Sequence, residues 1–395
     1  MASKNIKKDK PMEIKPEIET FAKIKVVGIG GSGNSAINRM ISSKIRGVDF
    51  VAINTDAQAL HHSKANSKLH IGKMTTKGLG AGMDPDLGLK AAEENQDDIH
   101  EILKGSDMVF ITCGLGGGTG TGAGPVIADI SKDIGALTVA VVTKPFGFEG
   151  EQRRLIAERG LNDLADKVDS IITIPNDRIL QIIDKKTSLL DSFIIVDDVL
   201  RQGVQGISDL ITVPGLINVD FADVKAIMEN TGSALMGIGK ASGENRSVEA
   251  AKAAIDSPLL ELSIDGAKGI LFTISGGPGL GMYEVNEAAK VITANADSNA
   301  KVIFGAVIDE EKKDEISITV IATGFGEKGK SVKKVTATRM TPFEDAGEVA
   351  EEKNPKPRAK FEPVAPVRET PDQSATRQKE EEELEIPAFI RKKMM

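Results

Sequence analysis

Two glycine-rich loops, each lying between a short apolar run and a helical pattern, constrain the fold of this 395-residue chain most strongly. The first covers residues 28–34 (GIGGSGN) and the second covers residues 114–122 (GLGGGTGTG). Glycines leave backbone amides uncovered, and the amides at a helix N-terminus favour a bound anion. Two such loops at neighbouring strand ends therefore predict a site for a polyphosphate.

The first half of the chain alternates apolar runs with helical patterns. Buried parallel strands are predicted at residues 23–28, 49–54, 107–113, 137–143 and 170–175. Helices are predicted at residues 35–45, 87–103, 124–134 and 150–165. Such alternation is typical of a doubly wound α/β domain, which we assign to residues 23–186.

A long central helix is predicted over residues 187–212, because apolar residues recur there at steps of three and four. Its apolar stripe is wide, which indicates a helix buried on most sides between two domains. Further helices are predicted at residues 222–228, 247–255 and 282–294, and strands at residues 269–275, 300–308 and 315–322. These elements predict a smaller α+β domain over residues 213–328.

Neither end of the chain has a periodic pattern. Residues 1–22 alternate charge and proline, which predicts a flexible arm. Residues 341–382 contain six Pro and 18 charged residues but no Ile or Leu. Such a segment cannot bury enough apolar area to offset its chain entropy, so we expect a disordered linker over residues 329–383.

The last residues, 384–395, combine a small apolar cluster with cations, which is typical of a short docking peptide. Ile386, Phe389 and Ile390 would form one face of a helix, with Pro387 in its first turn. Arg391 and the lysines after it would then lie at the helix C-terminus, where the dipole favours cations. The alternative is an unused tail.

Composition excludes several functions. The net charge is −8, from 50 Lys+Arg and 58 Asp+Glu, which disfavours broad binding to nucleic acid. Cys113 is the only cysteine, so a disulfide framework is excluded, and the four histidines lack the spacing of a zinc site. With no secretory signal and no apolar run of about 18 residues, we expect a cytoplasmic protein without direct membrane insertion.

The first loop also matches the dinucleotide fingerprint G-x-G-x-x-G, with Asp49 or Asp56 as the ribose-binding acid. That interpretation leaves the second loop unexplained. A Walker A loop is a poorer match still, since residues 237–241 (GIGKA) lack its spacing and its Ser or Thr. An NAD-dependent enzyme therefore remains a less favoured alternative.

Residues 116–122 (GGGTGTG) resemble the glycine-rich loop of the tubulin/FtsZ family, and the order of motifs agrees over residues 23–326 and in the C-terminal peptide. The chain is identified as a member of that family, similar to its bacterial cell-division GTPases. The resemblance implies a Rossmann-like GTPase domain, a central helix and a smaller C-terminal domain, with GTP or GDP and Mg²⁺ as ligands. Ser32 stands where the family commonly has glycine.

The resemblance also implies which residues contact the nucleotide. The first loop and a nearby segment would contribute Gly30, Gly31, Ser32, Gly33, Asn34 and Ala81, and the second loop Gly117, Gly118, Thr119, Gly120 and Thr121. A side chain at Gly118 is expected to enter the phosphate position. Glu149 and Arg153 would reach the ribose, although this spacing also fits a simple i,i+4 helix pair.

Guanine would be held by Asn176, Phe193 and Asp197. An aromatic ring can stack on the base, and a carboxylate can accept hydrogen bonds from the ring N–H and the exocyclic amine of guanine. Adenine does not present these two donors together.

A further motif, Asn218-x-Asp220-x-x-Asp223, follows the central helix. Two carboxylates at a helix start are more often capping residues than catalysts. In the family, however, this loop completes the active site of a neighbouring subunit, where carboxylates orient the attacking water and Mg²⁺ lies on the phosphates. A head-to-tail contact of this kind does not close and generates filaments.

The sequence therefore predicts a GTPase activated by self-assembly, which forms the division ring at midcell on the inner face of the membrane. Its C-terminal peptide would bind a membrane adaptor and other division proteins. Two related alternatives are a plasmid-segregating GTPase and a scaffold that binds GTP without hydrolysing it.

Overall fold

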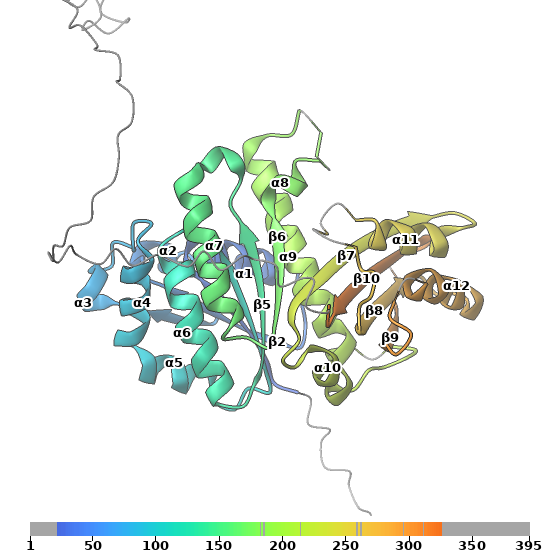
Figure 1. Cartoon of the computed structure of the whole chain (residues 1–395), viewed down its shortest axis with the longest axis horizontal. Helices are drawn as coiled ribbons and strands as arrows, with labels where there is room; N and C mark the ends of the chain where they lie inside the picture. Colours follow the sequence, from blue (N-terminus) through green and yellow to red (C-terminus); the bar gives the residue numbers. More distant parts are fainter. Residues whose placement is uncertain are drawn as a thin grey trace, which may run out of the picture. The chain divides into compact units, whose positions relative to one another are not determined.

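A computed structural model describes residues 22–325, except residues 182, 185, 214, 258–259, 261–262, 295 and 311. All but the last residue of the expected arm 1–22 lies outside the described residues, as do the linker 329–383 and the peptide 384–395. The described strands form one ten-stranded sheet in the order β3-β2-β1-β4-β5-β6-β7-β10-β8-β9 (Figure 1).

The strands follow the predicted apolar runs closely. They are β1 (Ile24–Ile29), β2 (Val48–Asn54), β3 (Ser67–His70), β4 (Met108–Gly114), β5 (Leu137–Lys144), β6 (Ser170–Pro175), β7 (Gly232–Ser242), β8 (Gly269–Gly276), β9 (Lys301–Ile308) and β10 (Glu315–Thr323). Of these, β3 and β7 were not predicted from the sequence.

The helices fill the segments between the strands. They are α1 (Gly30–Ser42), α2 (Ala57–His61), α3 (Lys73–Thr76), α4 (Pro85–Glu94), α5 (Gln96–Leu103), α6 (Thr119–Asp133), α7 (Glu151–Ala165), α8 (Asn176–Ile179), α9 (Leu189–Thr212), α10 (Phe221–Met228), α11 (Arg246–Ile255) and α12 (Met282–Thr293), with a 3₁₀ turn η1 (Gly147–Glu149). The single helix predicted at 87–103 is wrong, because Asn95 divides it into α4 and α5. The short helices α2, α3 and α8 were not predicted.

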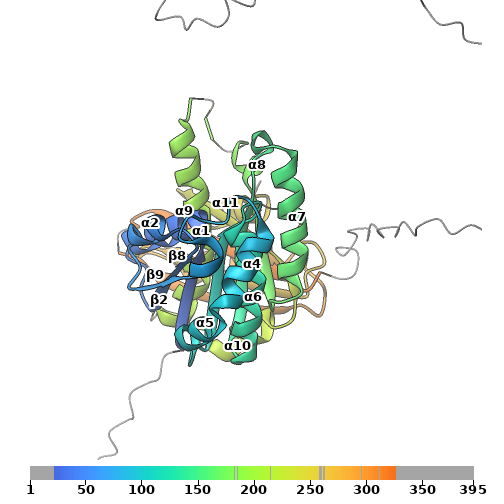
Figure 2. The same ribbon diagram turned by 90° about the vertical axis from the view of Figure 1, so that its left-hand side faces the viewer.

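Strands β1 to β6 are parallel, and helices cover both of their faces. Figure 2 shows α1 and α9 on one side of the strands and α4, α6 and α7 on the other. Alternate residues along each strand enter two separate cores: Val26 and Phe110 pack with α1 and α9, whereas Val27 and Ile111 pack with the α4–α7 layer. This arrangement confirms the predicted doubly wound domain.

The second domain is joined to the first by α9 and by β7. The first three residues of β7 pair in parallel with β6, and Leu235–Ser242 pairs antiparallel with β10. Helices α11 and α12 pack on one face of β7, β10, β8 and β9 around a third core. The predicted central helix and smaller α+β domain are therefore confirmed.

Candidate nucleotide-binding site

A pocket of about 350 Å³ opens where β1 and β4 end. It is lined by Ile29, Gly30, Gly31, Ser32, Gly114, Leu115, Gly117, Gly118, Thr119, Gly120, Thr143, Pro145, Glu149, Arg153, Asn176, Phe193, Val196, Asp197 and Leu200. Because parallel strands direct their carboxyl ends to one edge of the sheet, both glycine loops meet there. Most of the predicted nucleotide-binding residues are thus brought together.

Both loops run directly into helices, since α1 begins at Gly30 and α6 at Thr119. The predicted helix starts at 35 and 124 are therefore wrong, because the later glycines of each loop already form the first helical turn. Helix dipoles and uncovered amides of two elements therefore converge on one pocket. A Cβ atom added at Gly31 or Gly117 would meet no protein atom within 4 Å. Both glycines line the pocket, so the space beside them is open to a ligand.

The expected position of a side chain added at Gly118 is wrong. A Cβ at Gly118 would lie 2.8 Å from the Cβ of Ala81 and 2.8 Å from the carbonyl oxygen of Asp84, and so would clash with the segment before α4. The missing side chain at Gly118 leaves room for the segment before α4, while Gly118 itself still lines the pocket. Ala81 itself is buried against Gly118.

Four predicted residues, Gly33, Asn34, Ala81 and Thr121, are buried and do not line the pocket. Gly33 packs on the backbone, because its Cβ would lie 2.4 Å from the carbonyl oxygen of Thr112. The Thr121 hydroxyl accepts a hydrogen bond from the amide of Gly116 at 3.0 Å. Thr121 thus shapes the second loop.

Ser32 links the two loops. Its Oγ accepts a hydrogen bond of 2.8 Å from the amide of Gly114, at the end of β4. Ser32, which stands where the family commonly has glycine, therefore connects the first loop to the second through this hydrogen bond.

Phe193, Asn176 and Asp197 lie at the other end of the pocket. Phe193 is 41% exposed and packs edge-on against Phe146 at 5.6 Å, which leaves ring surface available to a planar base. Burial raises the pKa of Asp197 to about 6, although nearby Arg39 opposes that shift. The carboxylate is therefore ionised at neutral pH and is poised to accept hydrogen bonds.

Glu149 and Arg153 form the i,i+4 ion pair that the alternative interpretation predicted, and both also line the pocket. Glu149 additionally accepts a hydrogen bond of 2.9 Å from the amide of Phe146. The pair therefore stabilises the start of α7 while it borders the site.

Unpartnered polar atoms around the loops fit a bound polar ligand. Among the described residues, buried side-chain atoms without a hydrogen-bond partner include both amide atoms of Asn34, Nδ2 of Asn54 and Oδ1 of Asn176. Buried polar atoms are normally satisfied. Of these residues only Asn176 lines the pocket, so its Oδ1 is the unpartnered atom that a ligand there could reach.

Sequence reasoning missed several residues here. Thr143 and Pro145 line the pocket, and the Thr55 hydroxyl lies 2.6 Å from that of Thr119. Each follows or ends a parallel strand, and this position was the signal that could have identified them.

The acidic motif lies away from the pocket. Asp220 caps α10 by accepting a hydrogen bond of 2.8 Å from the amide of Asp223, and Asn218 accepts one of 2.6 Å from the amide of Gly215. All three motif residues are exposed. Figure 1 shows α10 at the opposite edge of the sheet from α8, whose first residue, Asn176, lines the pocket.

The described residues hold no group of three or more His, Cys, Asp or Glu side chains placed to bind a metal. None of the described helices combines the length and apolarity needed to cross a bilayer.

A parallel sheet with two glycine loops at helix N-termini, joined by a long helix to a second sheet, defines a nucleotide-binding protein of the tubulin-like class. Residues 23–184 match the GTPase domain of the tubulin/FtsZ family, and residues 232–326 match the FtsZ C-terminal domain. The chain belongs to the FtsZ family and is a GTPase that binds GTP and GDP.

Solved structures agree. An empty FtsZ dimer from M. jannaschii is 48% identical, covers 78% of this chain and 89% of its own, and superposes with a TM-score of 0.75. A point mutant of M. jannaschii FtsZ is also 48% identical, covering 77% of this chain and 91% of its own, with a TM-score of 0.74. CetZ2 from Haloferax volcanii, in a GTPγS-bound protofilament, shares the fold at 21% identity, covering 78% and 96%, with a TM-score of 0.66. The family assignment excludes the dehydrogenase alternative.

Proposed function

We propose that this GTPase is a cytoskeletal protein that assembles head-to-tail and hydrolyses GTP at the contact between subunits. The proposal rests on one observation: the loops that would bind the phosphates and the carboxylates that would orient the attacking water lie at different places on the molecule. The glycine loops converge on a pocket, whereas the exposed carboxylates of Asp220 and Asp223 lie outside it at the start of α10. A second copy could bring its carboxylates to the first copy's phosphates. The M. jannaschii FtsZ dimer supports self-association.

Each part of the pocket has a role in this mechanism. The amides around Gly31 and Gly117 hold the phosphates, with the dipoles of α1 and α6 aligned toward them. Phe193 stacks on guanine, and the ionised Asp197 accepts hydrogen bonds from its N–H groups. Glu149 and Arg153 border the ribose.

Hydrolysis requires a positioned water more than a covalent catalyst. Asp220 and Asp223 of the incoming subunit orient that water, and Asn218 holds the loop through its bond to Gly215. Mg²⁺ bound to the phosphates would neutralise charge that develops on the transferred group.

The test is GTP hydrolysis measured against protein concentration, with light scattering recorded in parallel. If the site is shared, activity per molecule is near zero below a critical concentration and rises with scattering above it. Constant activity per molecule across that range would contradict a shared site.

At the cellular scale, we propose that the filaments form the division ring at midcell, on the cytoplasmic face of the membrane. The FtsZ family assignment and the apolar residues Ile386, Phe389 and Ile390 support this proposal. The peptide, with Pro387 and Arg391, would dock on a membrane adaptor or another division protein.

Removing residues 384–395 tests that proposal, since it leaves the pocket and the α10 carboxylates intact. Filaments of the full and shortened chains are sedimented with adaptor-coated vesicles. Recovery of the full chain alone is the expected result, and equal recovery would show that the peptide has no docking role. In cells, the shortened chain is expected to lose midcell rings while its GTPase activity stays normal.

A further inference from the structure

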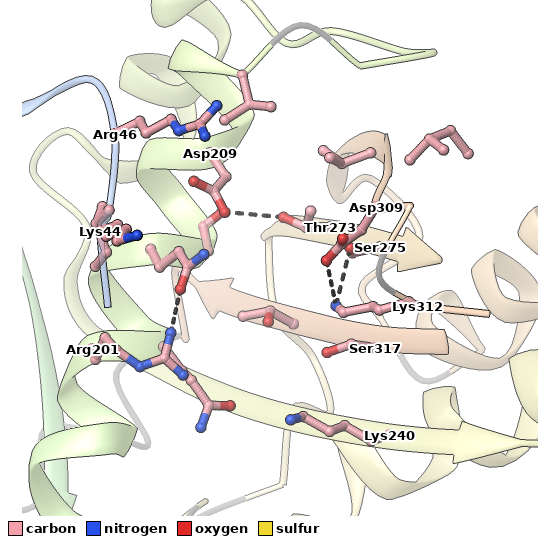
Figure 3. Close-up of a pocket in the computed structure, with 18 of the residues that line it drawn as sticks. Lys44, Arg46, Arg201, Asp209, Lys240, Thr273, Ser275, Asp309, Lys312 and Ser317 are labelled. Carbon is pink, nitrogen blue, oxygen red and sulfur yellow. Dashed lines mark hydrogen bonds and ion pairs between the residues drawn. The ribbon is translucent and has the colours of Figure 1, made fainter. Parts of the chain in front are cut away.

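A second cleft, of about 720 Å³, lies between the central helix α9, the loop after α1 and the C-terminal sheet (Figure 3). It shares no lining residue with the nucleotide pocket. Five cationic residues and three acidic residues line it, namely Lys44, Arg46, Arg201, Lys240 and Lys312 against Asp209, Asp309 and Glu310. The cleft is therefore polar and has an excess of positive charge.

The floor of the cleft is a row of polar side chains across three strands. Ser317 of β10 is the register partner of Lys240 on β7 and of Ser275 on β8. Side chains alternate along a strand, and Ile316 and Ile318 enter the core under α11 and α12. Ser317 therefore faces the other side, toward the cleft that it lines. On this face a hydroxyl and an ammonium group replace the usual apolar packing.

Lys312 reaches over this row. Its Nζ donates a hydrogen bond of 3.1 Å to Ser275 Oγ and lies 3.9 Å from Oδ2 of Asp309 (Figure 3). Ser275 accepts that bond, so its own hydroxyl proton remains available to an acceptor. Burial lowers the pKa of Lys312, and the charge of Lys240 lowers it further. Neighbouring acidic groups oppose that shift without removing it.

The opposite wall adds two cations from the loop after α1. Lys44 and Arg46 line the cleft, and within the described part of the chain neither forms an ion pair. The loop is held in place at Gly47, where a Cβ would lie 2.4 Å from the Cβ of Thr212 at the end of α9. By contrast, Arg201 is already paired with Asp198 at 2.6 Å. Within the described residues, the cleft cations outside any ion pair are thus Lys44 and Arg46 on the loop and Lys240 on the sheet, whereas Lys312 is paired with Asp309.

We propose that this cleft binds a small phosphate-bearing metabolite, with its phosphate group against Lys240, Lys312 and the hydroxyl of Ser317. Ammonium groups and free hydroxyl donors on a concave wall are the groups that bind a phosphate. Lys44 and Arg46 would meet a second anionic group of the same molecule. The site is distinct from the nucleotide pocket, because the two share no lining residue.

Pyrophosphate is the probe, titrated into the full chain by isothermal calorimetry with and without saturating GDP. The unmodified protein should bind pyrophosphate in the presence of GDP. Lys240→Gln should weaken that binding about fivefold. Lys252→Gln is the matched control, because this exposed lysine lies on α11, which covers the other face of the sheet.

Loss of pyrophosphate binding on addition of GDP would assign the probe to the glycine loops and overturn the proposal. Equal affinity in Lys240→Gln and the unmodified chain, or no binding at millimolar pyrophosphate, would also overturn it. Ser317→Ala provides a second variant that changes no charge, and it should weaken binding without lowering the melting temperature.

Discussion

Gly117 and Gly118, adjacent in the second loop, differ in their surroundings. The Cβ position of Gly117 is open, whereas that of Gly118 is filled by Ala81 and Asp84. Identical residues in one motif therefore leave space open to the pocket at one position and allow close chain packing at the next.

This difference predicts opposite phenotypes for two substitutions. Gly117→Val should leave the melting temperature nearly unchanged and weaken GTP binding about tenfold or more, because the side chain enters the phosphate space. Gly118→Val should instead destabilise the fold by about 2 kcal/mol, because it overpacks the segment before α4. Thermal unfolding without nucleotide and equilibrium GTP binding distinguish the two. A normal melting temperature for Gly118→Val would contradict the steric argument.

Asp197 gives the site a pH dependence. Its pKa is raised to about 6 by burial, and only the ionised form can accept both N–H groups of guanine. GTP binding therefore favours deprotonation. As the pH falls through about 6, affinity should decline by up to about tenfold per pH unit, whereas above neutrality it should be constant.

The measurement is GDP affinity between about pH 5 and 8. Asp197→Asn should bind weakly at every pH and lose this dependence, because its amide does not titrate in that range. A decline of the same slope in Asp197→Asn would assign the titration to another group.

At the scale of elements, β7 is a strand that the sequence pattern did not predict, because glycines interrupt its apolar alternation. Gly237 and Gly239 weaken its strand pattern, yet they are the residues over which α11 passes. A Cβ at either position would lie 2.0 Å from a carbonyl oxygen of α11. The absence of side chains permits the close helix–strand contact that closes the C-terminal core.

Gly239→Ala should therefore lower the free energy of unfolding by about 2 to 3 kcal/mol. Gly279→Ala is the matched control, since a Cβ there meets no atom within 4 Å, and its effect should stay within about 0.5 kcal/mol. Urea unfolding followed by circular dichroism measures both. Equal midpoints for the two variants would mean that α11 can move away at little cost.

At the scale of the whole molecule, the proposed chemistry is divided between the pocket and the start of α10. A head-to-tail contact joins the pocket of one subunit to the α10 end of the next and leaves further ends free. The same contact would thus be both catalytic and filament-forming.

A mixing experiment tests this division. Asp223→Ala keeps the pocket but should lose hydrolysis about tenfold or more. Gly117→Val keeps Asp223 but should bind GTP about tenfold more weakly or worse, so the mixture is assayed at a GTP concentration that leaves this variant largely empty. In an equal mixture, random assembly gives about one quarter of contacts an intact pocket facing an intact Asp223. Activity should therefore reappear on mixing. Two inactive variants that remain inactive together, while still co-sedimenting, would contradict a shared site.

The sequence by itself determined the strands β1, β4 and β5, the long helix α9 and the two glycine loops. The spacing of apolar residues and the positions of glycines, on which these predictions rest, are local properties of the chain. The tertiary structure alone decided that Asn95 splits one expected helix, that β7 joins both domains, and that the Cβ position of Gly118 is filled by Ala81. It also placed Lys240 beside Ser317 and Ser275 in a polar row. These features depend on contacts between residues far apart in the sequence, which no local pattern records.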